Sequence, residues 1–80
     1  MLVPLYGFLK GDSMGLLVLV HDTDPVAEIA RKLQQAAAVR VLPKQRASVQ
    51  HAGRRLAPEL TVAAAGLSAL DRVDVIPESE

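Results

Sequence analysis

The sequence contains no cysteine and no tryptophan, and Tyr6 and Phe8 are its only aromatic residues. Without cysteine, the chain can form neither a disulfide framework nor a metal site with thiolate ligands. Two aromatic side chains are also too few for the stacking platforms that bind single-stranded nucleic acids. These absences exclude a disulfide-stabilised domain and argue against a nucleic-acid-binding module.

The sequence also lacks a surplus of charge and a long hydrophobic run. Nine Lys and Arg residues balance nine Asp and Glu residues, whereas a sequence-independent nucleic-acid binder needs a cationic excess. No apolar run approaches the roughly 20 residues of a membrane span. The first residues have no basic leader and include Pro4 and Gly7, which is untypical of a signal peptide. We therefore expect a cytoplasmic protein that binds neither nucleic acid nor membrane.

What remains is the composition of one small globular domain. The chain has 80 residues, of which 50% are hydrophobic and 22% are charged. A length of 80 residues leaves room for a single core. We expect one domain over residues 1–80, with residues 77–80 as a solvated tail.

Two apolar runs near the start predict a β-hairpin. They cover residues 2–9 and 14–20, and the polar segment from Lys10 to Ser13 connects them. The second run is rich in Val and Leu and too short for a convincing helix.

The next segment predicts the main helix. Pro25 suits a first helical turn, and Thr23 or Asp24 can cap it. Apolar residues then recur every three or four positions, which is typical of a helix with one buried face. The predicted core stripe consists of Val26, Ile29, Ala30, Leu33, Ala36 and Ala37.

The second half predicts shorter elements. The first is a strand over 47–51, which a turn at Ala52 and Gly53 connects to a return strand over 54–56. One helical turn follows over 61–65, capped by Thr61 and ended by Gly66. The last element is a strand over 72–76. The whole order predicts an α+β fold of the β-grasp type, in which one main helix packs on one face of a small mixed sheet.

The stretch from Leu42 to Leu56, together with the segment from Leu60 to Leu67, resembles the second half of ubiquitin. Proteins of this type that are conjugated to other proteins end in Gly-Gly, whereas this sequence ends in Ile76-Pro-Glu-Ser-Glu, so we do not expect conjugation. Gln50 stands where ubiquitin carries its hydrophobic docking patch, which argues against that mode of recognition.

A set of positions spread over nearly the whole chain carries a second resemblance. These positions are Val3-Pro4, Phe8, Asp12, Leu17 to Val20, Val26-Ala27, Arg40, Val41, Pro43, Pro58, Thr61, Ala64, Gly66-Leu67 and Asp74-Val75. With them the chain resembles the toluene-4-monooxygenase system protein B family, the ubiquitin-like small subunits of bacterial multicomponent diiron hydroxylases. This sequence has fewer aromatic residues and a shorter, more acidic tail than the family pattern.

The resemblance implies a non-catalytic, gamma-type subunit of an aromatic or alkene monooxygenase. Its partner would be the large hydroxylase chain, which would hold the diiron centre, and this chain would bind no cofactor. The alternative is a free-standing ubiquitin-like adaptor or regulator, similar to the small β-grasp protein of type VII secretion systems. An enzyme in its own right is the third class, and the residues offer it no catalytic constellation.

The potential catalytic and metal-binding residues are few and scattered. His21 and His51 lie in different connections and are better explained as a polar turn residue and a partly packed strand end. No serine has the Gly-x-Ser-x-Gly context of a nucleophile. Capping explains Asp22 and Asp24 more simply than acid–base chemistry or calcium binding. We therefore expect no catalytic, cofactor-binding or metal-binding residue in this chain.

An excess of apolar residues on the sheet predicts a protein interface. The run Leu16 to Val20 is apolar at both alternating positions, although one face of a sheet under a single helix should be polar. The alternatives are a loop that covers this face or a register shifted by one residue. With Leu17 and Leu19 pointing toward the helix, the expected outward-facing residues are Tyr6, Phe8, Leu16, Val18, Val20, Asp74 and Ile76.

Basic residues are concentrated in the middle of the chain. Residues 31–55 contain seven of the nine Lys and Arg residues and no acidic residue. This segment predicts a docking surface for an acidic protein, and the alternative is an ordinary solvated surface. The candidate residues are Arg31, Lys32, Arg40, Arg54 and Arg55.

Overall fold

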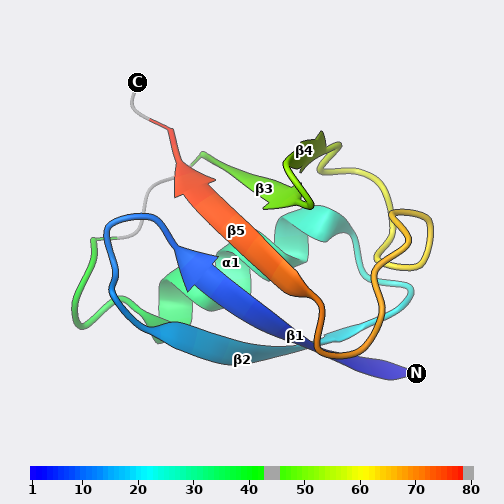
Figure 1. Ribbon diagram of the computed structural model, residues 1–80, viewed down its shortest axis with the longest axis horizontal. Helices are drawn as coiled ribbons and strands as arrows, with labels where there is room; N and C mark the ends of the chain where they lie inside the picture. The colour runs from blue at the N-terminus through cyan, green and yellow to red at the C-terminus, as the bar shows by residue number, and fades with distance from the viewer. Residues whose placement is uncertain (43–45, 79–80) are drawn as a thin grey trace.

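The structure, a computed structural model, describes residues 1–42 and 46–78 and contains one mixed sheet covered by one helix. The elements are β1 (Leu2–Leu9), β2 (Gly15–His21), α1 (Val26–Ala36), β3 (Ala47–His51), β4 (Arg54–Leu56) and β5 (Arg72–Pro77). The strand order is β2-β1-β5-β3-β4, and α1 crosses behind the sheet in the view of Figure 1. The predicted α+β β-grasp fold and its order of elements are confirmed.

The two central strands come from opposite ends of the chain. β1 and β5 are parallel, with Tyr6 opposite Arg72 and Leu9 opposite Val75. β2 pairs antiparallel with β1 on one side, and β3 pairs antiparallel with β5 on the other. The edges of the sheet are therefore β2 and the three-residue strand β4.

Backbone carbonyls of a distant loop satisfy the start of α1. The N–H groups of Val26 and Ala27 donate to the carbonyls of Leu60, at 2.7 Å, and Pro58, at 3.0 Å. Such first-turn N–H groups have no partner within a helix, so these bonds replace a side-chain cap. The prediction that Thr23 or Asp24 caps the helix is wrong, because Pro25 is the N-cap residue and no side chain of the described residues forms a capping hydrogen bond there.

The core lies between α1 and the inner face of the sheet. Gly7 is important to this packing, because a Cβ atom there would lie 3.1 Å from a Leu33 methyl group. The predicted helix stripe is confirmed except for Ala36, which is exposed, while Gln34 is buried instead. The largest fully buried side chains are Leu5, Leu9, Val20, Val26, Ile29, Leu33, Val62, Val73 and Val75.

Both predicted turns of the second half are present. Ala52 and Gly53 have φ of 53° and 77° between β3 and β4. Thr61 Oγ1 accepts a 3.0 Å hydrogen bond from the Ala64 N–H, and Gly66 follows with φ of 76°. This segment forms turns rather than a regular helix.

The end of the chain departs from the prediction of a solvated tail. Pro77 is the last residue of β5 and lies opposite Ala47, and the Glu78 N–H donates to the Arg46 carbonyl at 2.9 Å. The prediction is therefore wrong for residues 77 and 78, and residues 79–80 lie outside the described part. Among the described residues, no helix is long and apolar enough to span a membrane.

Candidate functional site: the outer face of the sheet

The outer face is the side of the sheet that α1 leaves uncovered, and it is turned toward the viewer in Figure 1. Side chains alternate between the two sides of each strand, so the buried residues of a strand identify the residues that face outward. By this criterion the outer face includes Pro4, Tyr6 and Phe8 of β1, Leu17 and Leu19 of β2, Arg72, Asp74 and Ile76 of β5, and Ser48 and Gln50 of β3.

The predicted orientation of β2 is wrong. Val18 and Val20 are core residues with 4% and 0% of their surface exposed, and Leu16 is half-buried against the core. Leu17 and Leu19 point outward in their place. The outward positions of Tyr6, Phe8, Asp74 and Ile76 are confirmed by the burial of the residues between them.

The hairpin register is the physical reason for this correction. Tyr6 lies opposite Leu17, and Pro4 lies opposite Leu19. Directly opposite residues of an antiparallel pair share a face, so an outward Tyr6 requires an outward Leu17. The expected turn from Lys10 to Ser13 already implies this register, and following it across the turn would have identified both leucines.

The half of the outer face over β1 and β2 is apolar and open. Leu17 and Leu19 are 63% and 53% exposed, and Tyr6 is 46% exposed. Tyr6 lies opposite Leu17, and Pro4 lies opposite Leu19 on the same two strands, so these four side chains are neighbours on one face. An exposed apolar patch of neighbouring side chains is typical of a protein interface.

The two aromatic rings lie together beside this patch. Their centroids are 5.7 Å apart, and the planes of Tyr6 and Phe8 differ by 15°. Gly15, opposite Phe8, makes room for them, because a Cβ atom there would lie 2.7 Å from the Phe8 ring. The absence of a side chain at this position of β2 therefore allows the Phe8 ring to lie where it does.

The half of the face over β5 and β3 is mainly polar, although it includes Ile76. The Arg72 guanidinium carbon lies 4.2 Å from the centre of the Phe8 ring, a cation–π arrangement, and the same guanidinium is 3.1 Å from Asp74 Oδ1. Asp74 lies opposite Gln50 of β3. The stacked and paired Arg72 thus marks the boundary between the apolar and polar halves of the outer face.

An ion pair at one end of the sheet connects the β1–β2 turn to the segment after α1. Arg40 binds both oxygens of Asp12, with Nη2 at 2.8 Å from Oδ2 and Nε at 3.0 Å from Oδ1. The Asp12 side chain is only 2% exposed. The hydrogen bonds from Arg40 hold the pKa of Asp12 below its ordinary value.

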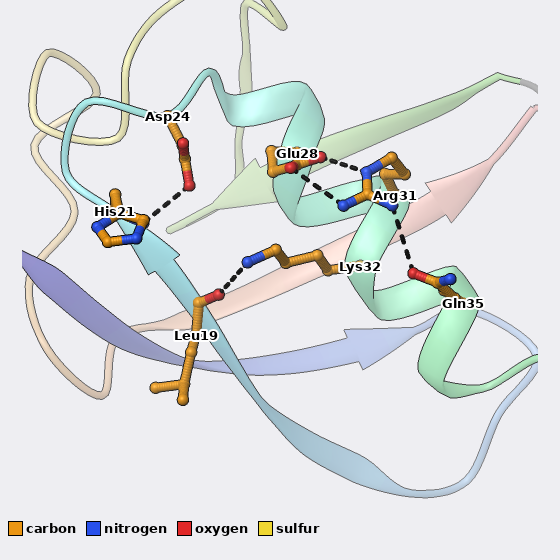
Figure 2. A network of polar contacts seen from close by, with 7 residues as sticks. All are labelled: Leu19, His21, Asp24, Glu28, Arg31, Lys32 and Gln35. Carbon is orange, nitrogen blue, oxygen red and sulfur yellow. Dashed lines mark hydrogen bonds and ion pairs between the residues drawn. The ribbon is translucent and has the colours of Figure 1, made fainter.

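The predicted basic surface is not assembled on one side of the molecule. Lys32 contacts β2 at one edge of the sheet, whereas Arg54 and Arg55 belong to β4 at the other edge. Arg31 pairs with Glu28 on α1, as Figure 2 shows, and Arg55 lies 3.5 Å from Glu78. With Arg40 bound to Asp12, three of the five candidate residues have carboxylate partners from this chain.

Neither histidine belongs to a metal centre among the described residues. His51 lies 2.9 Å from the Arg72 carbonyl through Nδ1, and β1 and β5 separate its strand from the strand of His21. Within residues 1–42 and 46–78, no three His, Cys, Asp or Glu side chains are grouped so that they could hold a metal ion. The described residues therefore do not fit a diiron site.

The sequence matches the family of toluene-4-monooxygenase system protein B over residues 2–76. No protein of curated function matches it significantly.

Solved structures resemble the fold over nearly its whole length. A chain of "Toluene 4 monooxygenase HD Complex with Inhibitor 4-Bromobenzoate" superposes with a TM-score of 0.88 at 23% identity, covering 98% of this chain and 100% of that one. Ubiquitin of Caldiarchaeum subterraneum has a TM-score of 0.78 at 17% identity, with 100% and 98% covered. A protein designed on ubiquitin gives 0.80 at 20% identity, with 99% and 92% covered. These similarities show that the fold is ubiquitin-like.

Proposed function

Because the chain belongs to the family of toluene-4-monooxygenase system protein B, we propose that it is the small, non-catalytic subunit of a bacterial diiron monooxygenase. Its function is to bind and buttress the large hydroxylase chain. The binding surface is the outer face, with Tyr6, Leu17 and Leu19 at its apolar centre. The protein acts in the cytoplasm, where the complex oxidises aromatic or alkene substrates.

One observation supports the proposal that this chain contributes binding to the monooxygenase complex. The described part of the chain presents an open apolar patch but no group of His, Cys, Asp or Glu side chains that could hold a metal ion. The diiron centre is accordingly assigned to the large partner chain. The structural neighbour from a toluene 4-monooxygenase complex supports a partner of this kind.

The composition of the outer face suits a protein partner. Tyr and Arg are enriched among the residues that dominate binding energies at interfaces, and this face presents Tyr6 and Arg72 beside exposed leucines. The aromatic pair and the stacked Arg72 are held in place before binding, so ordering them costs little conformational entropy.

Purification of the tagged chain from its native host, followed by metal analysis, tests the proposal. We expect a stoichiometric complex with a large chain that carries about two iron ions, as diiron carboxylate proteins do. Isolation of the chain with secretion-system proteins instead would favour the adaptor. Isolation without any stable partner would also contradict the proposal.

A further inference from the structure

Within residues 1–42 and 46–78, β2 is an edge strand of the sheet, and one side of its backbone has no neighbouring strand. Its register with β1 shows which groups face that side. On the side of β1 that faces β5, the Pro4 carbonyl accepts a backbone hydrogen bond and the Tyr6 N–H donates one. Leu19 and Leu17, which lie opposite them, therefore direct their own N–H and carbonyl groups to the open edge.

Two charged side chains occupy part of this edge. Lys32 reaches from α1 and donates from Nζ to the Leu19 carbonyl at 2.7 Å. Asp24, just before the helix, accepts a 2.8 Å hydrogen bond from the His21 N–H through Oδ2. Figure 2 shows both side chains reaching β2 from the helix side of the sheet. One backbone carbonyl, of Leu19, and one backbone N–H group, of His21, are thus already bound to side chains at this edge.

We propose that Lys32 and Asp24 close the β2 edge against strand addition, and that the strand they exclude is β2 of a second copy of this chain. β2 has seven residues, and those from Leu16 to Val20 are all apolar. Such a strand with free backbone groups is prone to pair with its own copies. Antiparallel pairing of two β2 edges along their length uses the Leu19 carbonyl and the His21 N–H, which Lys32 and Asp24 already occupy.

The opposite edge of the sheet, formed by β4, also resists pairing with another strand, because of its length and its charge. β4 has only three residues, and Arg54 and Arg55 are two of them. Short, positively charged edge strands resist edge-to-edge pairing. Basic residues of the segment 31–55 therefore lie at both edges of the sheet, and the outer face is left as the surface open to partners.

Lys32→Met tests the proposal, because it removes the ammonium donor and keeps much of the aliphatic stem. Arg31→Met is the matched control, since it removes a cation from the adjacent helix position without touching β2. Sedimentation velocity over a concentration series measures the mass of each folded protein. We expect the wild type and Arg31→Met to remain near the 8.5 kDa monomer, and Lys32→Met to rise toward twice that mass.

Amide hydrogen exchange, measured by NMR, locates the contact. In the Lys32→Met dimer, the N–H groups of Leu17 and Leu19 become protected by the second strand and exchange more slowly than in the monomer. A monomeric Lys32→Met at the highest concentration overturns the proposal, as does a dimer without this protection. If Lys32→Met fails to fold by circular dichroism, Asp24→Ala provides the same test at the other blocked group. These readouts concern the free chain and do not depend on the proposed function.

Discussion

The two faces of the sheet are built from the same strands and both carry apolar side chains, yet one is closed and the other is open. On the inner face, Val18 and Val20 lie under α1 and are buried. On the outer face, Leu17 and Leu19 of the same strand are more than half exposed. Apolar character alone therefore does not decide which residues form the core, since the register of the hairpin assigns each residue to a face.

This difference separates residues that maintain the fold from residues that are available for binding. Removal of an inner residue leaves a cavity, because α1 and the sheet are in contact. A change on the outer face leaves the core intact and alters only the surface offered to a partner. Substitutions at neighbouring positions of β2 should therefore have opposite consequences.

Val18→Asp should have the largest effect and should severely destabilise the fold. A carboxylate at this fully packed position has no basic partner in the core, and we expect a loss of more than about 4 kcal/mol in the free energy of unfolding. Leu17→Asp, the adjacent position on the outer face, should cost less than about 1 kcal/mol. Urea denaturation followed by circular dichroism measures both, and equal losses would contradict the assignment of the faces.

Leu33→Ala should lower the free energy of unfolding by about 2–5 kcal/mol, because Leu33 is fully buried and packs on Gly7. Gln35→Ala, on an exposed position of the same helix, is the control and should change stability by less than about 0.5 kcal/mol. Urea midpoints of the two variants provide the comparison. A neutral Leu33→Ala would show that the helix presents another side to the sheet.

Acid should destabilise the fold through three carboxylates that are paired with cations of this chain. Arg40 lowers the pKa of Asp12, the N-terminal ammonium lowers that of Asp22, and Arg31 lowers that of Glu28. Because each folded-state pKa lies below the ordinary value of 3.8 or 4.5, the stabilisation is complete above those values and is lost as the pH falls through the folded-state pKa.

The contribution of Asp12 can be isolated with Asp12→Asn, which keeps the shape of the side chain but cannot titrate. Urea midpoints between pH 2 and pH 7 should fall less steeply below about pH 4 in this variant than in the wild type. At neutral pH, Asp12→Asn should be the less stable protein. Identical pH profiles would show that the Arg40 pair contributes nothing to stability.

Ala52→Asn should have the smallest effect, a gain of roughly 0.5–1 kcal/mol. Ala52 has φ of 53°, a left-handed conformation that costs alanine energy and that asparagine tolerates better. The change lies in the β3–β4 turn and leaves both faces unaltered, so partner binding should not change. Thermal unfolding measures the gain, and a lower melting temperature would contradict the conformational explanation.

The order of elements was predictable from the sequence because each boundary has a local cause. Pro25 begins the helix, and the turn at Ala52 and Gly53 reverses the chain. The orientation of β2 was not evident from its composition, since Leu16 to Val20 is apolar at every position. The ion pair of Asp12 with Arg40 depends on residues 28 positions apart, and only the folded chain brings them together.

The central claim is that the outer face binds the hydroxylase chain. Its most direct test is the affinity of that chain, purified from the same host, for wild type and for the double variant Leu17→Asp/Leu19→Asp. Val39→Asp, an equally drastic change at an exposed position outside the sheet, is the control. We predict a loss of at least about tenfold for the double variant and no change for Val39→Asp. Undiminished binding by a folded double variant would contradict the account.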